Sequence, residues 1–100
     1  MTFRHQADGK IEVMAPPEWE PIASLLFGIE HMKPIIDLMV EYARNPAEEP
    51  RAVGGGQEYW VVIDKDKAVI RSDFSNASVT LPRVEFLLII EEFAKRVERL

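Results

Sequence analysis

Residues 57–74, QEYWVVIDKDKAVIRSDF, decide the fold of this chain. Two runs rich in β-branched and aromatic residues, at 57–64 and 67–74, flank the polar pair Lys65-Asp66. This pattern is typical of a β-hairpin. A two-residue turn places Trp60 opposite Arg71 and Val62 opposite Val69. The other face of the hairpin then carries the apolar residues expected in the core: Tyr59, Val61, Ile63, Ala68, Ile70 and Phe74.

The chain after this hairpin predicts a short strand at 77–81 and a C-terminal helix that begins at Pro82. Proline suits the first helical position, where its missing N–H is harmless. Phe86, Ile90, Phe93 and Val97 follow at helical spacing and form the apolar stripe expected to face the core. Val84 and Leu88 point away from this stripe, and we expect them to complete a contact between helices.

The chain before the hairpin predicts another helix and a long loop. From Ile22 to Ala43 the apolar residues keep a helical period across Pro34, which removes a backbone donor. We therefore expect one bent helix or two short helices nearly end to end. Residues 45–57, with two prolines and three consecutive glycines, predict a mobile loop.

The predicted helix has a second apolar stripe beside its main one. A helix that lies on one sheet needs only one apolar face, so the second must meet the C-terminal helix or another copy of the chain. A homodimer is therefore one interpretation of this stripe. Its residues are Phe27, Ile35, Leu38 and Tyr42.

The N-terminal residues predict a first hairpin, in which 2–6 and 10–14 flank Ala7-Asp8-Gly9. That register places Phe3 opposite Met14 and His5 opposite Glu12. The order of elements is then β-β-α-β-β-(β)-α. We expect an α+β fold in which a small mixed or antiparallel sheet, built from two hairpins, carries helices on one face. Residues 1–100 are expected to form a single domain.

Composition limits the classes of function. The 100 residues are 47% hydrophobic, lack cysteine, and include 17 acidic and 12 basic side chains, for a net charge of −5. This balance disfavours binding to nucleic acid or to an anionic membrane and permits a basic partner. No apolar run reaches the roughly 20 residues that span a bilayer, and the N-terminus does not resemble a signal peptide. We therefore expect a cytoplasmic protein without a cofactor.

The sequence shows no pattern of a catalytic centre. His5 and His31 are far apart, Asp64-x-Asp66 lacks the rest of a calcium loop, and Gly54-Gly55-Gly56 does not open a helix. We therefore predict that the chain is not an enzyme. The alternative of an enzyme requires Asp64 and Asp73 to meet His5 in space.

The second hairpin offers a candidate binding face around Trp60 and Arg71, with Glu58 and Asp73 beside them. Tryptophan and arginine are over-represented among the residues that dominate binding energy at protein interfaces. The simpler interpretation of the face is a Trp60–Arg71 stack on a solvated sheet.

Two segments also resemble a known group of proteins. GQEYWVVIDKDKAVIRSDF (56–74) and LPRVEFLLIIEEFAKRV (81–97) resemble the C-terminal half of YacL-like proteins and of small bacterial immunity proteins from contact-dependent inhibition and other polymorphic toxin systems. The resemblance covers less than half of the chain. It implies a cytosolic protein that covers the active site of a basic nuclease toxin and brings no catalytic residues of its own.

We therefore predict a non-enzymatic immunity or antitoxin-like protein that neutralises a basic toxin domain, such as a nuclease. The alternative is a homo-oligomeric structural or regulatory module that associates through the second helical stripe. The residues predicted to bind the partner are Glu58, Trp60, Asp64, Asp66, Arg71 and Asp73.

Overall fold

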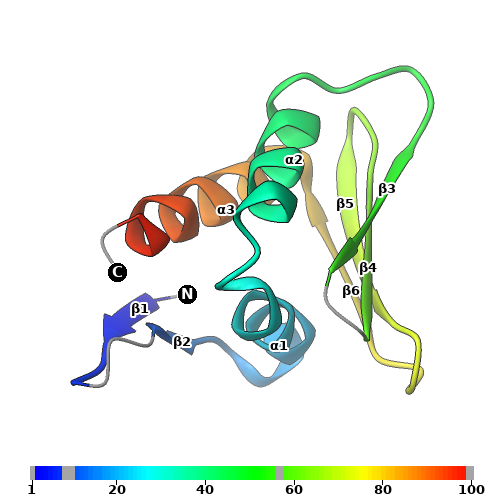
Figure 1. Cartoon of the computed structure of the whole chain (residues 1–100). Helices are drawn as coiled ribbons and strands as arrows, with labels where there is room; N and C mark the ends of the chain where they lie inside the picture. The colour runs from blue at the N-terminus through cyan, green and yellow to red at the C-terminus, as the bar shows by residue number, and fades with distance from the viewer. Residues whose placement is uncertain (1, 8–10, 56–57, 99–100) are drawn as a thin grey trace.

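The computed structural model describes residues 2–7, 11–55 and 58–98, without the side chain of His5. This part of the chain forms two antiparallel sheets and three α-helices, as the predicted α+β class requires (Figure 1). The elements are β1 (Thr2–His5), β2 (Ile11–Met14), the 3-10 turn η1 (Pro17–Trp19), α1 (Glu20–Ile29), α2 (Lys33–Arg44), β3 (Arg51–Gly55), β4 (Tyr59–Ile63), β5 (Lys67–Ser72), β6 (Ser78–Pro82) and α3 (Arg83–Val97).

The main sheet is an antiparallel meander with strand order β3-β4-β5-β6. Its centre confirms the predicted hairpin, because Trp60 pairs with Arg71 and Val62 pairs with Val69. The Asp64 N–H donates to the Lys67 carbonyl at 3.0 Å, which leaves the expected two residues in the turn. The predicted strand at 77–81 is also present, as β6.

All three helices cover the same face of this sheet (Figure 1). The alternation along β4 and β5 turns their buried side chains toward the helices, whereas Trp60 and Arg71 point the other way. In the lower part of the molecule α1 lies between the main sheet and the small sheet β1–β2 (Figure 1). Residues that form the core include Ile22, Leu25, Leu26, Ile29, Ile36, Met39, Val61, Ile63, Ile70, Phe86, Ile90 and Phe93.

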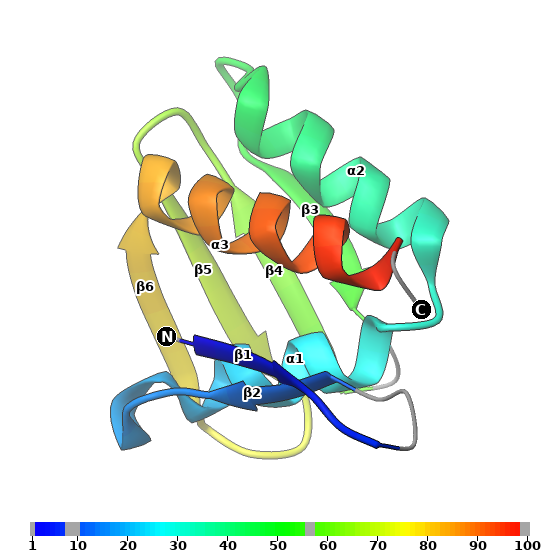
Figure 2. The ribbon, with the colours of Figure 1, turned by 90° about the vertical axis from the view of Figure 1, so that its left-hand side faces the viewer.

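The chain does break at Pro34, but the two helices are not end to end. Pro34 lies in the first turn of α2, where a proline is tolerated, and α1 ends at Ile29. Figure 1 looks almost along α1, whereas α2 rises in the plane of the picture. The direction changes because α2 turns away to pack beside α3 (Figure 2).

The predicted loop at 45–57 is wrong in part, since Arg51–Gly55 forms the edge strand β3. Pairing with β4 outweighs the low strand propensity of glycine. Gly54 and Gly55 allow other parts of the chain to pack closely against the backbone of β3. A Cβ atom on Gly55 would lie 2.2 Å from Leu25 Cδ1, so glycine at this position lets α1 approach the sheet.

The predicted register of the N-terminal hairpin is wrong by one residue. Phe3 pairs with Val13, His5 pairs with Ile11, and Arg4 pairs with Glu12. This register turns Phe3, Val13 and Ile11 toward the core and leaves Arg4 and Glu12 to form an ion pair on the other face. The predicted Asp8-Gly9 turn lies outside the described residues.

Three side chains predicted to be covered are exposed. Phe74 is 77% exposed because β5 ends at Ser72, before the alternation would turn Phe74 inward. Val84 and Leu88 are 57% and 65% exposed, because α2 packs against a different side of α3 and leaves them uncovered. Pro82 ends β6 and precedes the first residue of α3 by one position.

The contact between Gly55 and Leu25 leads to a stability prediction. Gly55→Ala should lower the free energy of unfolding by about 1–3 kcal/mol, because the buried Leu25 must move to admit a methyl group. Urea unfolding measures this change. Gly54→Ala is the matched control, since its Cβ would meet the Trp60 ring at an ordinary 3.7 Å. Equal stability of the two variants would contradict the packing role of Gly55.

Candidate functional site

The face of the main sheet that points away from the helices has no other element over it among the residues that the structure describes (Figure 1). The strand register places a band of apolar side chains across it, and polar side chains lie at its margins. We call it the outer face. Its residues on the four strands are Ala52, Gly54, Trp60, Val62, Lys67, Val69, Arg71, Ser78, Thr80 and Pro82.

Trp60 is held in place on the outer face from two sides. Its ring lies over Gly54, the residue paired with it in β3, where no side chain competes for the space. Its indole N–H donates to the Asp73 carboxylate at 2.7 Å. The side chain nevertheless stays 41% exposed. Trp60 is therefore a large, oriented aromatic group that a partner can contact at little cost in side-chain entropy.

Arg71 lies opposite Trp60 in β5 and is exposed. Across the described residues, the cations found over aromatic rings are Arg51, at 4.0 Å from the Tyr42 centroid, and Arg96, at 5.5 Å from Phe3. The simpler interpretation of a Trp60–Arg71 stack is therefore wrong. The indole N–H of Trp60 donates to Asp73 instead, and Arg71 is exposed.

Glu58 lies near Trp60 but not on the outer face. It precedes β4, so the alternation of the strand does not fix its direction. Its Oε1 accepts a 2.9 Å hydrogen bond from the hydroxyl of Ser72, a buried residue of β5. The Glu58 carboxylate is thereby drawn around the end of the sheet toward α1.

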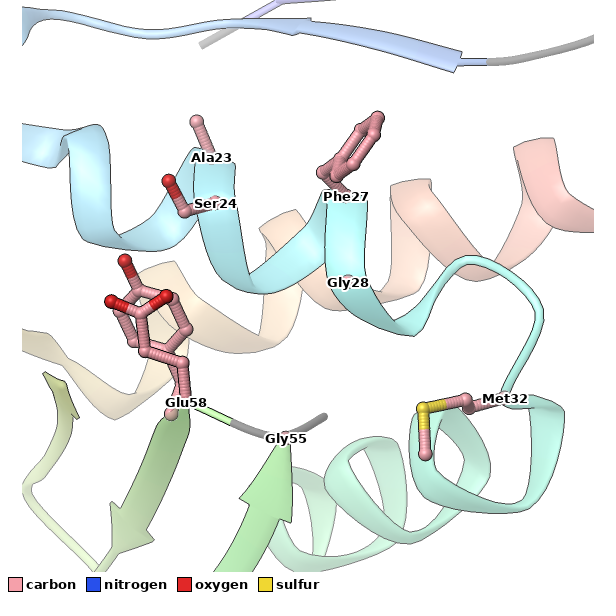
Figure 3. A pocket seen from close by; sticks show the side chains of 8 residues that line it. Ala23, Ser24, Phe27, Gly28, Met32, Gly55 and Glu58 are labelled. Atoms are coloured by element: carbon pink, nitrogen blue, oxygen red, sulfur yellow. The ribbon is translucent and has the colours of Figure 1, made fainter. Parts of the chain in front are cut away.

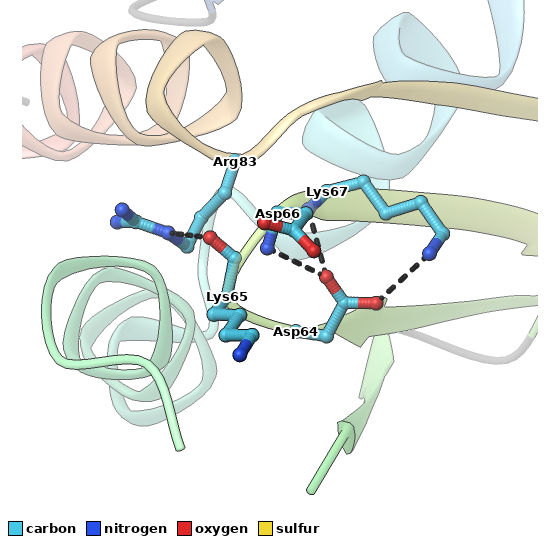
Figure 4. A network of polar contacts seen from close by, with 5 residues as sticks. All are labelled: Asp64, Lys65, Asp66, Lys67 and Arg83. Carbon is cyan, nitrogen blue, oxygen red and sulfur yellow. Dashed lines mark hydrogen bonds and ion pairs between the residues drawn. The ribbon is translucent and has the colours of Figure 1, made fainter. Parts of the chain in front are cut away.

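Asp64 and Asp66 lie at the opposite end of the β4–β5 pair (Figure 4). Asp64 Oδ1 accepts hydrogen bonds from the N–H groups of Asp66 and Lys67 at 2.7 and 2.8 Å, and Oδ2 lies 3.1 Å from Lys67 Nζ. These bonds favour the ionised carboxylate and lower the pKa of Asp64 from 3.8 to about 2. Asp64 therefore stabilises the turn.

Arg83 ties the same turn to the helical layer. Its side-chain Nε donates to the Lys65 carbonyl at 2.9 Å (Figure 4). Its backbone N–H donates to the Asp66 carbonyl at 3.0 Å. A second nitrogen of the guanidinium reaches the Ala43 carbonyl at the end of α2. These contacts give this end of the hairpin a structural role.

The structure therefore brings together three of the six residues predicted to bind a partner, namely Trp60, Arg71 and Asp73. Glu58 is adjacent but faces another surface, and Asp64 and Asp66 are distant. The alternative of an enzyme required the Asp64 and Asp73 carboxylates to lie close together. The structure instead places these two residues at opposite ends of the hairpin.

The residues predicted for self-association do not form one continuous face. Phe27 is on α1 and is separated from the other three by the break between the helices. On α2, Ile35 and Tyr42 pack partly against the core, and Arg51 covers the Tyr42 ring. Leu38 remains 36% exposed.

An open pocket lies where α1 faces the ends of β3 and β4 (Figure 3). Its volume is about 820 Å³. The sequence did not predict it, because the strand β3 was not expected and the walls come from distant segments. The exposed Phe27 and the glycine that follows it on α1 were the available signals. We call this cavity the α1 pocket. Its lining residues are Ala23, Ser24, Phe27, Gly28, Met32, Gly55, Glu58 and Tyr59.

Two further features are absent from the described residues. They contain no group of three or more His, Cys, Asp or Glu side chains placed to hold a metal ion. No described helix has both the length and the apolar character needed to cross a membrane.

No protein-family model matches the chain, and no curated protein and no solved structure matches it either.

The hydrogen bonds of Asp64 predict how stability depends on pH. A carboxylate whose pKa is lowered in the folded state contributes stability above its ordinary pKa, and this contribution is lost as pH falls through the lowered value. The free energy of unfolding of Asp64→Asn should therefore be lower than that of the wild type at neutral pH. The difference should shrink between pH 3.8 and about 2.

Denaturant unfolding at a series of pH values measures this difference. Asp66→Asn removes the same charge from an exposed neighbour, and it should change the stability at neutral pH less than Asp64→Asn does. A difference between wild type and Asp64→Asn that stays constant with pH would show that the charge of Asp64 has no such role.

Proposed function

We propose that this chain is a non-enzymatic immunity or antitoxin-like protein, which binds a basic toxin domain through the outer face and blocks its active site. The observation that carries the proposal is Trp60, which is held by Asp73 and Gly54 and yet remains 41% exposed. A large aromatic side chain that is fixed in position and only half covered is typical of an interface anchor.

The surroundings of Trp60 suit an interface with a basic protein. Val62 and Val69 extend the apolar band along the sheet, and both are half-buried. Asp73 places a carboxylate beside Trp60, and Phe74, the next residue along the chain, is a further exposed aromatic residue. An interface with an apolar centre and charged margins follows the usual anatomy of protein complexes.

The charge of the whole chain supports the same class of partner. A net charge of −5 accelerates the encounter with a cationic protein and opposes wrong encounters with anionic ones. Inhibition of this kind needs no catalytic group in the inhibitor, because covering the cationic active site is sufficient. The resemblance of residues 56–74 and 81–97 to immunity proteins supports the same mechanism.

The proposal predicts that Trp60→Ala weakens binding of the partner by about 2 kcal/mol or more, because it removes the central anchor. The partner is to be captured from the native host on the immobilised chain, identified, purified, and assayed for inhibition at a 1:1 ratio. Calorimetry then compares wild type with Trp60→Ala. Rising salt should slow association more than it speeds dissociation.

Leu88→Ala is the matched control, since it removes another exposed apolar side chain, from α3. It should leave the affinity within about 0.5 kcal/mol of wild type. A purified basic partner that binds wild type and Trp60→Ala equally would exclude the outer face as the interface. A partner whose activity is unchanged in the complex would exclude the inhibitory role.

A further inference from the structure

We propose that the α1 pocket receives an arginine-bearing segment of the basic partner, with the guanidinium at Glu58 and the aliphatic stem against Met32 and the helix surface at Gly28. This inference rests on the proposed function, from which it takes the premise that the partner is a basic protein. It adds a second contact site, distinct from the outer face, and it names the side chain that the site selects.

The walls of the pocket are apolar and open. Met32 is 36% exposed and lines the space, and Phe27, 64% exposed, borders it with its ring turned toward β1 and β2 (Figure 3). Nothing lies within 4 Å of the position of a Cβ on Gly28, so this part of the helix leaves the pocket floor clear. A volume of about 820 Å³ is within the range of ligand pockets and exceeds that of one side chain, so a short peptide segment fits it.

The polar end of the pocket is built around Glu58. Figure 3 shows the Ser24 and Glu58 side chains at one end of the pocket and Met32 at the other. Ser24 donates its own hydrogen bond to Glu20, which places a second carboxylate next to this end. Among the residues that the structure describes, the pocket lining includes Glu58 and no lysine or arginine.

A hydrogen-bond network fixes the Glu58 carboxylate. The Ser72 oxygen accepts from the N–H groups of Phe74 and Ser75 at 3.2 Å each, so its single proton is left for Glu58 Oε1. The Glu58 carbonyl also accepts from the Asp73 N–H at 2.7 Å. None of the described residues bonds the second oxygen, Oε2. Glu58 is therefore oriented by one oxygen and free to bind a ligand through the other.

An arginine side chain can interact favourably with both the polar and the apolar end of this pocket. Its planar guanidinium donates several hydrogen bonds to carboxylate oxygens, and its stem packs on apolar and thioether side chains. A purely apolar ligand would cover the Glu58 carboxylate without replacing its hydrogen bonds to water, which is costly. An anionic ligand would be repelled by Glu58 and Glu20.

The test uses the ¹⁵N-labelled chain and the peptide acetyl-Leu-Arg-Leu-amide, with its citrulline counterpart as a neutral probe of the same shape. The arginine peptide should shift the amide resonances of Gly28, Met32 and Gly55. Its dissociation constant should be about tenfold lower than that of the citrulline peptide, as expected for a hydrogen bond between charged groups.

Two variants locate the site. Glu58→Gln keeps the acceptor for Ser72 and removes the charge, so it should weaken arginine-peptide binding about tenfold. Gly28→Leu places a large side chain in the pocket. Its Cβ would meet nothing within 4 Å and leucine improves helix propensity, so the variant should fold, which circular dichroism checks, and peptide binding should be lost. Asp66→Asn, which removes a charge at the other end of the hairpin, should leave peptide binding unchanged.

Equal binding of the arginine and citrulline peptides, or unchanged binding by Gly28→Leu, would overturn the inference. The purified partner separates this inference from the proposed function. If Trp60→Ala weakens the complex while Gly28→Leu and Glu58→Gln do not, the pocket is wrong and the outer face stands. If the peptides bind as expected but no basic partner is inhibited, the proposed function fails and the arginine site stands.

Discussion

The contact between α1 and the edge strand β3 is the constraint on which the arrangement of the molecule depends. Leu25 is fully buried and lies against the backbone of Gly55, where any larger residue would collide with it. This close approach lets α1 fill the space between the main sheet and the small sheet β1–β2. The α1 pocket lies beside the same contact, so its shape also depends on a glycine at position 55.

Two neighbouring glycines have opposite roles because the side-chain positions alternate along a strand. Gly55 faces the helices and admits Leu25, whereas Gly54 faces outward and lies under the Trp60 ring. A methyl group at Gly54 would only touch the Trp60 ring at 3.7 Å, whereas a larger side chain would compete with Trp60 for the outer face. The three helices cover only one side of the sheet, so Trp60 gains its support from β3 and from Asp73 instead of from a covering element.

The sequence predicted the structure correctly where the apolar alternation along two successive strands was consistent with a single pairing register. The alternation at 57–64 and 67–74 predicted the pairing of Trp60 with Arg71, and hence the centre of the outer face. The pattern failed at Arg51–Gly55, because glycine-rich segments resemble loops and only pairing with β4 makes them a strand. Pro34 predicted a break in the helix but not its direction, which packing against α3 decides. The α1 pocket joins segments about 30 residues apart, so Phe27 and Gly28 alone could not show which strand ends lie opposite them.

The two candidate contact sites meet at the start of β4. Tyr59 turns into the core, Trp60 turns to the outer face, and Glu58, just before the strand, turns toward the α1 pocket. Each of these side chains is fixed by packing or by a hydrogen bond, so binding requires little further ordering of the chain. β3, at the edge of the sheet, is the strand next to both sites. Under the two proposals, a partner that extended around this edge would contact both sites in one interface, and the ordered start of β4 would take part in each contact.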